Sequence, residues 1–422
     1  MVDKMFIMQG ASGCGKSTFI NDNNLHGYVI SPDEIRGIIN PSPEVYDRVS
    51  RSIVHGYDFS GRTSAEAFRI AQDICAARMN KGETIIIDSV AARRRTIGGF
   101  LHEAQVYGYA VKYVDMQENL TLDEIMKRND SRGIRAIPHD VVENQYRNCN
   151  EYRIEKNEEK ITRAQMMSMS LVKEHNLDAF DTVSIVGDIQ GCFSTFRHSG
   201  RNENKDGEFI IFAGDLFDRG PDDEAAPMFD WLLGHHQDED KAFVIGNHDS
   251  YLRFYGDDAH GDYGKSTQTT ISHIMHDSPM VGNSPKRLHR FSNAIYRSMV
   301  PMYAFSFHDR HYVVTHGGMH PSVFDDARVE GGYKLGFNSD QSFWYGTGTT
   351  VNTGDYDIDI DDIIEHERHD DSPIQIHGHR NEHHHALNDY RHVYNLETQV
   401  EHGGFLSIVR IDGNGINTEQ YQ

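Results

Sequence analysis

The chain has 422 residues, of which 38% are hydrophobic and 10% aromatic, and its formal net charge is -23. This length exceeds what one hydrophobic core usually organises, so we expect at least two domains. No apolar run approaches the roughly 18 residues of a membrane span, which argues against a protein with membrane-spanning helices. The acidic balance argues against a chain that binds nucleic acid over its whole surface.

The acidity is concentrated in the second half of the chain. Residues 1–180 contain 23 Lys and Arg against 25 Asp and Glu, and subtraction from the totals of 41 and 64 leaves 18 against 39 for the rest. The second half also holds 21 of the 26 histidines. A surplus of Asp and His is what a metal-dependent domain needs for ligands, although most of these residues are expected to form a solvated surface.

The cysteines give no sign of a disulfide framework or a zinc site. The four residues are far apart and show none of the paired spacings of either feature. They are Cys14, Cys75, Cys149 and Cys192. A reducing cytosol is therefore the expected location.

In the first block, short apolar runs alternate with helical patterns. The predicted strands are Met5–Met8, Tyr28–Ile30, Thr84–Ile87 and Ala110–Val114, and a helix is predicted over Ser64–Met79. This order predicts an α/β domain with a parallel sheet flanked by helices. A polar stretch from Glu151 to about Glu174, free of Pro and Gly, predicts a helical connector. We place the domain boundary near Asp178, which gives domains of residues 1–178 and 179–422.

A glycine-rich loop follows the first predicted strand and leads into a helical pattern. It matches the P-loop pattern, in which backbone N–H groups wrap phosphates, a lysine neutralises the β and γ oxygens and a hydroxyl binds Mg²⁺. A purely structural glycine turn rarely reproduces the whole pattern. The predicted ATP-binding residues are Gly10, Ser12, Gly13, Cys14, Gly15, Lys16, Ser17 and Thr18, with Ser17 as the Mg²⁺ ligand.

Carboxylates follow two further strands of this block. Asp33 lies just after the second strand, and Arg36 lies three residues later. Strand ends face the ligand crevice of an open α/β sheet, so Asp33 can accept the proton of an attacking hydroxyl and Arg36 can bind a phosphate of the acceptor. The alternative is that Asp33 only caps a helix and that Arg36 is a surface residue of the same helix. Asp88 is a further candidate for the magnesium shell or the acceptor site.

Three arginines recur through a segment that ends at Ile137-Pro138. Arg128, Arg132 and Arg135 have a spacing that suits a mobile lid closing over the phosphates of ATP. The alternative is a solvated basic face, because most runs of charge are solvated.

In the second block, each of several predicted strands runs into a loop bearing Gly, Asp or His. The strands are Val183–Val186, Phe209–Phe212, Ala242–Ile245 and Tyr312–Thr315. The loops are Gly187-Asp188-Ile189-Gln190-Gly191, Gly214-Asp215 with Asp218-Arg219-Gly220, Gly246-Asn247-His248-Asp249, Thr315-His316-Gly317 and His377-Gly378-His379. One such tripeptide would more often be a capped turn, but five in order indicate one shared site.

These loops supply what a two-metal phosphoesterase needs. Two cations roughly 3.5–4 Å apart require a shared carboxylate and further oxygen and nitrogen ligands from separate strand ends. The predicted ligands are Asp188, Gln190, Asp215, Asn247, His316 and His379, with Asp215 as the bridge. We predict that His248 protonates the leaving alkoxide, that Asp218 orients it and that Arg219 clamps the substrate phosphate. His235-His236 and His383 to His385 are expected to be exposed loop residues.

With these motifs, the second block resembles the binuclear metallophosphoesterases, in the branch of phosphoprotein phosphatases and dinucleoside tetraphosphate hydrolases. The closing segment Tyr394–Thr398 and Gly403–Leu406 is similar to that branch's last strand pair. The resemblance implies an α+β fold with a two-sheet sandwich flanked by helices and two divalent metals, with manganese as the expected ion. Gln190 stands where the family usually has a metal-binding histidine, and an amide oxygen is a weaker ligand.

The first block resembles the 5'-hydroxyl polynucleotide kinases, which carry a P-loop, an Asp-x-x-Arg motif and an arginine-bearing lid in this order. Lys16, Ser17, Asp33, Arg36 and Arg132 match that pattern. Ser89-Val90 follow Asp88 where those kinases tend to carry Thr-Asn. As a whole, the chain looks like the kinase and phosphatase modules of bacterial polynucleotide kinase-phosphatases of RNA repair. No ligase module follows, so a separate ligase is a possible partner, and an acidic chain without a ligase module suggests the cytoplasm of a bacterium or of a phage-infected cell.

The leading hypothesis is therefore an end-healing enzyme for RNA or DNA. Asp33 would be the base, and Lys16 with Arg132 would clamp the transition state. A second hypothesis keeps both sites but makes the chain a small-molecule or nucleoside kinase fused to a nucleotide or protein phosphatase. A third treats Gln190 as the mark of a decayed metal site in a non-catalytic nucleotide sensor; the presence of the other expected ligands ranks it last.

Overall fold

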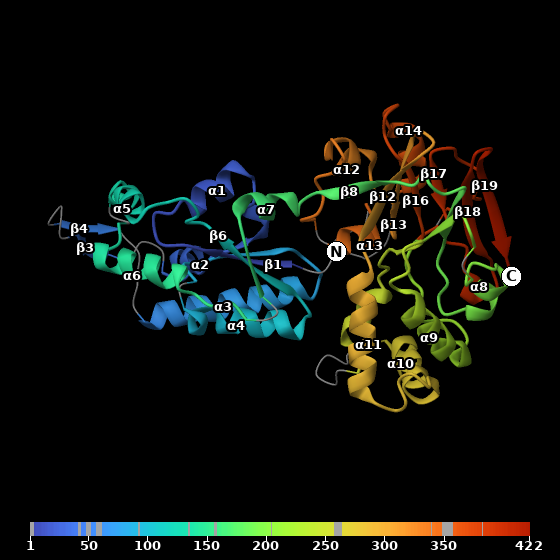
Figure 1. Ribbon diagram of the computed structural model, residues 1–422, viewed down its shortest axis with the longest axis horizontal. Helices are drawn as coiled ribbons and strands as arrows, with labels where there is room; N and C mark the ends of the chain where they lie inside the picture. The colour runs from blue at the N-terminus through green and yellow to red at the C-terminus, as the bar shows by residue number, and fades with distance from the viewer. Residues whose placement is uncertain are drawn as a thin grey trace. The chain divides into compact units, whose positions relative to one another are not determined.

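The computed structural model describes residues 4–40, 44–47, 52–55, 61–91, 93–133, 136–155, 158–203, 205–256, 264–338, 340–347, 358–381 and 383–422 (Figure 1). It divides into two compact units, one up to Ser170 and one from Leu171 onward. None of the helices within these ranges is long and apolar enough to cross a membrane. The four cysteines are buried and free.

The first unit is built on a five-stranded sheet in which all strands run parallel. Its order is β2 (Val29–Ile30), β5 (Ile85–Asp88), β1 (Lys4–Gln9), β6 (Ala110–Asp115) and β7 (Glu158–Ile161). The helices are α1 (Lys16–Asp22), α2 (Pro32–Ile39), α3 (Gly61–Met79), α4 (Arg94–Val106), α5 (Leu122–Asp130), α6 (His139–Asn150) and α7 (Arg163–Ser168). A short 3-10 helix, η1, spans His26–Tyr28, and β3 (Glu44–Asp47) pairs with β4 (Ser52–His55).

One face of this sheet packs against α2, α3 and α4. Because side chains alternate along a strand, Met5 and Ile7 of β1 share that face with Ile85 and Ile87 of β5. The helices add side chains such as Phe100 to the same buried cluster. The predicted α/β domain is confirmed, and the four predicted strands correspond to β1, β2, β5 and β6.

The stretch from Glu151 to Glu174, which was expected to be one helix, is a different structure. It contains β7, the short helix α7 and the start of β8 (Val172–Asn176). β7 pairs with β6 in the first unit, whereas β8 pairs with β12 in the second. The prediction was wrong because strand pairing outweighs the helix propensity of a polar sequence rich in Glu, Lys and Met. The structural division precedes β8 and so lies earlier than Asp178.

The second unit contains two sheets packed face to face. The first has the order β11 (Lys241–Phe243), β10 (Glu208–Phe212), β9 (Thr182–Val186), β18 (Leu406–Asp412) and β19 (Gly415–Tyr421). The second has the order β14 (Arg328–Val329), β15 (Gly332–Tyr333), β8, β12 (Met302–Phe307), β13 (Arg310–Thr315), β16 (Ile374–His377) and β17 (Val393–Asn395). β9, β10 and β11 run parallel to one another, as do β13 and β16.

Helices cover the outer faces of this pair of sheets (Figure 1). They are α8 (Phe193–His198), α9 (Ala225–His235), α10 (Lys265–Asp277), α11 (Pro285–Ser298), α12 (Pro321–Asp325), α13 (Asp340–Tyr345) and α14 (Ile360–Glu367). Short 3-10 helices are η3 (Asp222–Glu224), η4 (Asp249–Phe254) and η6 (Val400–His402). α8 to α11 pack on the five-stranded sheet, and α12 and α13 pack on the seven-stranded one.

The core lies between the two sheets and follows the period of two along each strand. Phe209 and Ile211 of β10 point into the cluster between the sheets, whereas Ile210 and Phe212 point toward α9. Phe305 of β12 belongs to the cluster between the sheets. The expected two-sheet α+β fold is confirmed, and it brings the carboxyl ends of the parallel strands to one edge of the sandwich.

Candidate functional site

The loop between β1 and α1 has the geometry of a phosphate cradle. Gly13 and Gly15 have φ of +94° and +97°, a conformation that side chains disfavour. A Cβ at Gly13 would lie 2.7 Å from the carbonyl oxygen of Ile125, so α5 packs against the loop too closely for any other residue. Gly15 caps α1 without a side-chain hydrogen bond, which leaves the first N–H groups of α1 available to an anion.

Lys16 folds back over this loop. Its Nζ donates to the carbonyl oxygens of Gly10 at 2.8 Å and Ala11 at 3.4 Å, both of which are neutral acceptors. Two glutamines from outside the motif hold the loop's backbone. Gln117 accepts from Ala11 N at 3.2 Å, and Gln145 of α6 accepts from Ser12 N at 2.9 Å. No local pattern marks either glutamine, because each lies more than one hundred positions from its partner.

Asp33 does not cap α2, because Ser31 occupies the cap and accepts from Glu34 N at 3.4 Å. Asp33 instead forms an ion pair with Arg36, with 2.5 Å between Oδ1 and Nη1. The Asp33 side chain is 70% exposed and that of Arg36 is 8% exposed. A buried guanidinium therefore holds an open carboxylate in place, which removes the simple capping interpretation.

Asp88 lies at the end of β5, beside the loop that follows β1. Burial raises the pKa of the Asp88 carboxyl, Lys16 opposes this rise and Asp33 adds to it. Arg132 also acts to lower it. Lys16, Asp33, Asp88 and Arg132 thus share one electrostatic neighbourhood.

The arginines of the expected lid lie on and after α5. Arg128 is exposed in the last turn, and its Nη1 lies 3.9 Å from the position that a Cβ on Gly15 would take. Arg132 is exposed in the turn after α5, and Arg135 lies outside the described residues. The buried Asn129 closes the turn, since it donates to Ile137 O at 2.7 Å and accepts from Ile137 N at 3.0 Å. Sequence reasoning missed Asn129.

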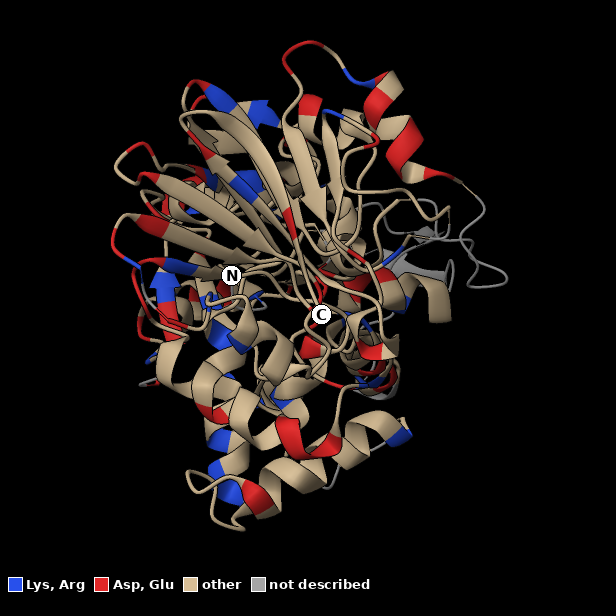
Figure 2. Cartoon of the chain, turned by 90° about the vertical axis from the view of Figure 1, so that its right-hand side faces the viewer, with Lys and Arg blue, Asp and Glu red and all other residues tan. Residues whose placement is uncertain are grey.

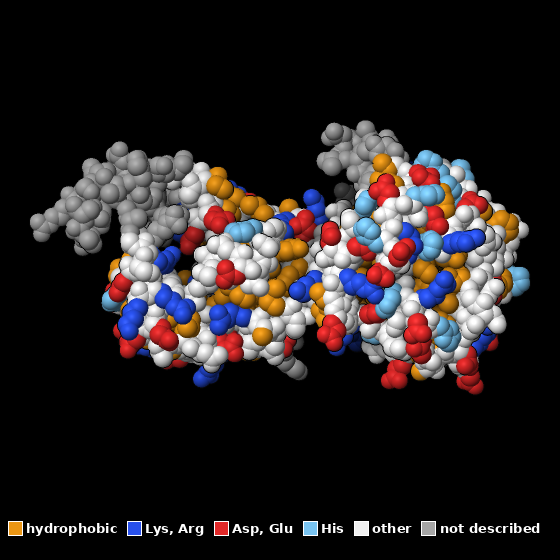
Figure 3. All heavy atoms as spheres, turned by 90° about the horizontal axis from the view of Figure 1, so that it is seen from above, with side chains coloured by type: hydrophobic (Ala, Val, Ile, Leu, Met, Phe, Trp, Pro, Cys, Tyr) orange, Lys and Arg blue, Asp and Glu red, His pale blue; other side chains and the backbone are white. Residues whose placement is uncertain are grey.

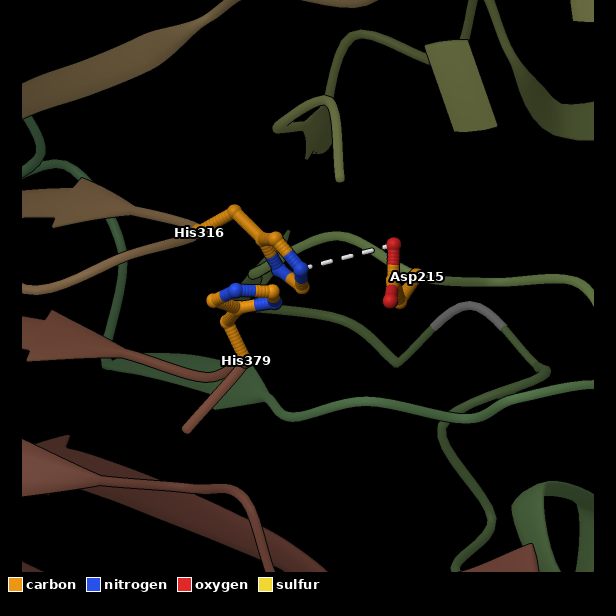
Figure 4. Close-up of side chains that lie close together, drawn as sticks. All are labelled: Asp215, His316 and His379. Carbon is orange, nitrogen blue, oxygen red and sulfur yellow. Dashed lines mark ion pairs between the residues drawn. The ribbon is translucent and has the colours of Figure 1, made fainter. Parts of the chain in front are cut away.

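In the second unit, the predicted metal ligands all come from loops at one edge of the sandwich. Asp215, His316 and His379 follow β10, β13 and β16, and their ligand atoms lie within 4.8 Å of one another. Figure 4 shows the two imidazoles side by side, facing the Asp215 carboxylate. The Asp215 Oδ1 to His316 Nε2 distance is 3.4 Å.

The loops after β9 and β11 add the remaining predicted ligands around Asp215. Gln190 Nε2 donates to Asp215 Oδ2 at 3.0 Å, and the backbone N of His248 donates to Oδ1 at 2.9 Å. Asn247 Oδ1 lies 3.1 Å from His316 Nε2. Asp188 accepts from His379 N at 3.2 Å, so Asp188 joins the same cluster.

The donor set fits divalent cations. His316 Nδ1 donates to the carbonyl of Ala213 at 2.9 Å, so Nε2 is the ring nitrogen that faces the oxygens of Asp215 and Asn247. The Oε1 of Gln190 is buried and has no hydrogen-bond partner. A carboxylate, an imidazole nitrogen and amide oxygens therefore converge in a buried place, and these are groups that bind divalent cations.

The charges of the cluster are unbalanced without such a cation. Burial, followed by the carboxyls of Glu397 and Asp215, raises the pKa of Asp188 well above its usual value. Burial would also raise the pKa of Asp215, but His316 and His248 hold it well below the ordinary range. Burial and His316 lower the pKa of His379 to about 3. Glu397, hydrogen-bonded to Asp188, is a member of the site that sequence reasoning missed.

Backbone strain is concentrated in these loops. Positive φ angles of +50° to +72° occur in five non-glycine residues of the site, and such angles cost free energy that the surrounding fold must supply. They are Gln190, Asp215, Asp218, Arg219 and His379. Two glycines make room for the cluster. A Cβ at Gly378 would lie 1.8 Å from Asp188 Oδ1, and one at Gly246 would lie 2.1 Å from Asp215 Oδ1.

His248 is held by a buried carboxylate at the margin of the cluster. Its Nδ1 lies 2.8 Å from Oδ2 of Asp218, and Thr267 of α10 donates to the same oxygen at 2.6 Å. Burial favours the neutral imidazole, but Asp215 and Asp218 outweigh it and raise the pKa of His248. The imidazole is therefore oriented and kept ready to carry a proton.

Arg219 lies beside this pair and lines a pocket. Its side chain is 47% exposed, with Nη1 at 3.8 Å from Glu401, and its backbone N donates to Ser266 at 2.9 Å. The pocket is lined by Gly191, Phe217, Asp218, Arg219, Gly220, Pro221, Asp222, Ala225, Lys265, Ser266, Thr269 and Thr270. A group bound next to His248 would thus meet two cationic side chains and several hydroxyls.

The histidines that were expected to be exposed loop residues differ among themselves. His383 and His384 are exposed, but His385 is half-buried and its Nε2 lies 2.8 Å from Asp359. His235 and His236 are also half-buried at the end of α9, and each forms a hydrogen bond with a neighbouring acceptor.

Asp359, Asp361 and His385 form a second group of possible ligands, of which Asp361 is already bonded to His377 and Asn395. Many histidines lie on the surface of the second unit (Figure 3).

Two family models match the chain. Residues 5–153 match a model described as an AAA domain, and residues 182–412 match the model of calcineurin-like phosphoesterases. The second match spans more than half of the 422 residues. The expected architecture, a P-loop unit followed by a metallophosphoesterase unit, is confirmed. No curated protein matches the chain.

Several solved structures resemble part of the chain at low identity. A protein serine/threonine phosphatase from Saccharomyces cerevisiae is 15% identical over 61% of this chain and 87% of its own, with a TM-score of 0.39. A gluconokinase from Sinorhizobium meliloti 1021 is 17% identical over 39% and 85%, with a TM-score of 0.27. A chain of the Pnkp1/Rnl/Hen1 RNA repair complex is 14% identical over 65% and 86%, with a TM-score of 0.29. At these values the likeness carries no argument about activity.

If the cluster around Asp215 binds Mn²⁺, the ion should stabilise the native protein. At one hundred times the dissociation constant, binding adds about 2.7 kcal/mol, which for a unit of this size raises Tm by roughly 5–10 °C. Asp215→Asn should abolish this rise in thermal unfolding experiments, and Asp359→Asn, in the second acidic group, should keep it. Retention of the full rise in Asp215→Asn would show that Mn²⁺ binds elsewhere.

Proposed function

The chain belongs to the calcineurin-like phosphoesterase family, and from this premise we propose that it heals broken nucleic-acid ends. The two units indicate a kinase and a phosphatase, which use ATP and divalent metals. In our proposal the first unit transfers the γ-phosphate of ATP to the 5'-hydroxyl end of RNA or DNA. The second unit removes a 3'-phosphate or a 2',3'-cyclic phosphate, which prepares the break for a separate ligase.

The observation that carries the kinase proposal is the ion pair of Asp33 and Arg36, since Asp33 and Lys16 both act on the Asp88 carboxyl. The exposed Asp33 carboxylate is open to the hydroxyl of a large substrate and can accept its proton. Arg36 fixes that carboxylate and can bind the phosphate next to the 5' end. The loop of Gly10 to Ser17 would hold ATP with Mg²⁺ on Ser17, and Lys16 with Arg132 would stabilise the charge of the transferred group.

In the phosphatase unit, the cluster around Asp215 would hold two divalent metals. The residues that would hold them are Asp188, Gln190, Asp215, Asn247, His316 and His379. Bound metals would polarise the phosphate and supply a nucleophilic water at neutral pH. Arg219, with its partly exposed guanidinium, would bind a phosphate oxygen.

His248 would act as the general acid of this unit. A sugar alkoxide is a poor leaving group, so its departure needs a proton, and Asp218 with Thr267 holds the imidazole in position to give one. The same proton donation serves both a 3'-phosphate and a cyclic phosphate, because an alkoxide leaves in each case.

The proposal is tested with a single oligonucleotide that carries a 5'-hydroxyl and a 3'-phosphate, in RNA and DNA versions, with labelled ATP and Mg²⁺ or Mn²⁺. Label at the 5' end together with release of phosphate from the 3' end is the expected result. If neither end changes while nucleosides are phosphorylated or small phosphate esters are hydrolysed, the chain is a small-molecule kinase fused to a phosphatase and the proposal fails.

Replacing Asp33 separates the two activities. Asp33→Asn should lower 5' phosphorylation about 100- to 10,000-fold, because the hydroxyl loses its proton acceptor, and should leave 3'-phosphate removal unchanged. Asp73→Asn, which breaks the exposed ion pair with Arg69 on α3, is the matched control and should keep both activities. Loss of both activities in Asp33→Asn would mean that Asp33 has a structural role.

The role of His248 depends on the leaving group. His248→Ala should lower the hydrolysis of a 3'-phosphate end by about 100-fold or more, and that of p-nitrophenyl phosphate far less, because nitrophenolate leaves without a proton. His273→Ala, at an exposed ion pair with Asp277 on α10, should change neither rate. Equal losses on the two substrates would rule out proton donation by His248.

A further inference from the structure

A second pocket lies beside the metal cluster, on the side of the closing segment. It is lined by Asn381, His384, His385, Glu397, Thr398, Gln399, Gly404 and Phe405. Glu397 connects the pocket to the cluster, because its carboxyl is hydrogen-bonded to that of Asp188. Asn381 follows His379 closely on the same loop. The pocket and the metal cluster are therefore neighbours, with Glu397 between them.

The pocket presents an aromatic ring to solvent. Phe405 is 42% exposed, and it is the one phenylalanine among the exposed large hydrophobic side chains of the described ranges. The other phenylalanines of this unit that lie in β9 to β12 and α8 to α9 are packed into its cores. An exposed ring at the mouth of a site offers a flat apolar surface that a ligand can cover.

The backbone holds this ring in a fixed position. Phe405 N donates to Thr398 O at 3.1 Å, and Thr398 Oγ1 donates back to Phe405 O at 2.6 Å. Gly404 N donates to Gln399 O at 2.9 Å, and a Cβ on Gly404 would lie 1.9 Å from Thr398 O. Because the turn is closed this tightly, the backbone from which the ring projects is ordered before any ligand arrives.

The polar groups around the ring suit an uncharged planar ligand. Gln399 and His384 are exposed at its sides and carry an amide and an imidazole, which can pair with the edge of a heterocycle. None of the eight lining residues is Lys or Arg, so the pocket is not built for a further phosphate. The pocket beside His248 has the opposite character, since Arg219 and Lys265 line it.

We propose that Phe405 is the stacking platform for the nucleobase of the terminal nucleotide whose phosphate is removed. The inference rests on the proposed function and adds a subsite to it. Bases stack on aromatic side chains regardless of sequence, which suits an enzyme that must accept any broken end. The phosphate would lie on the metal cluster, the base on Phe405, and the remaining backbone would leave past Arg219.

The test compares two oligonucleotides with a 3'-phosphate, identical except that the terminal nucleotide of one is abasic. The wild-type protein should hydrolyse the base-bearing end with the higher kcat/KM. Phe405→Ala should lower this preference about 10-fold or more, and Phe405→Trp should restore it, because stacking needs only an aromatic face. Met280→Ala, which removes another exposed apolar side chain of the same unit, should keep the wild-type preference.

Three results would overturn the inference. Equal kcat/KM of the wild type on the two ends, or an undiminished preference in Phe405→Ala, would show that no base stacks on this ring while leaving end healing intact. A phosphoserine peptide whose hydrolysis falls in Phe405→Ala, with oligonucleotide hydrolysis unchanged, would assign the pocket to peptides. Hydrolysis of p-nitrophenyl phosphate without hydrolysis of either oligonucleotide would overturn the proposed function itself.

Discussion

The buried carboxylate of Asp215 is the constraint on which the phosphoesterase unit depends. Its two oxygens receive N–H groups from Gln190 and His248 and face the imidazole of His316. Loops from several parallel strands must meet at this point, and the backbone adopts strained positive φ angles at Asp215, Asp218 and His379 to achieve it. Each such angle costs about 1–3 kcal/mol, so the two-sheet core has to hold the loops in place.

Much of this site could be predicted from the sequence, because the proposed ligands lie just after the ends of strands. Asp188, Asp215 and His316 each follow a run of buried residues, and parallel strands bring their carboxyl ends to one edge. The P-loop could also be predicted, since its glycines and Lys16 lie within one short segment of the sequence. In these cases the position of a residue just after a strand, or within one short loop, is enough to predict that the side chains of the site lie together.

Contacts between segments that are distant in the sequence could not be predicted in this way. Thr267 reaches Asp218, Glu397 reaches Asp188 and Gln145 reaches the P-loop from positions where no local pattern marks them. The stretch after Glu151 failed for a related reason, because its strands exist only through partners in β6 and β12. Secondary-structure propensity is a property of the segment alone, whereas these contacts depend on the distant residues against which the segment packs.

The acidity of the second unit has a kinetic consequence. Figure 2, in which Asp and Glu positions are red, shows acidic positions along many loops and helices of this unit. Counted from position 181, the sequence carries 39 acidic residues against 18 Lys and Arg. A polyanionic strand is repelled by such a surface, so added salt screens repulsion here instead of weakening attraction. Under the proposed function, the unit would hold the strand only at its terminal nucleotide, through the phosphate and the base, and would release the strand quickly after the phosphate is removed.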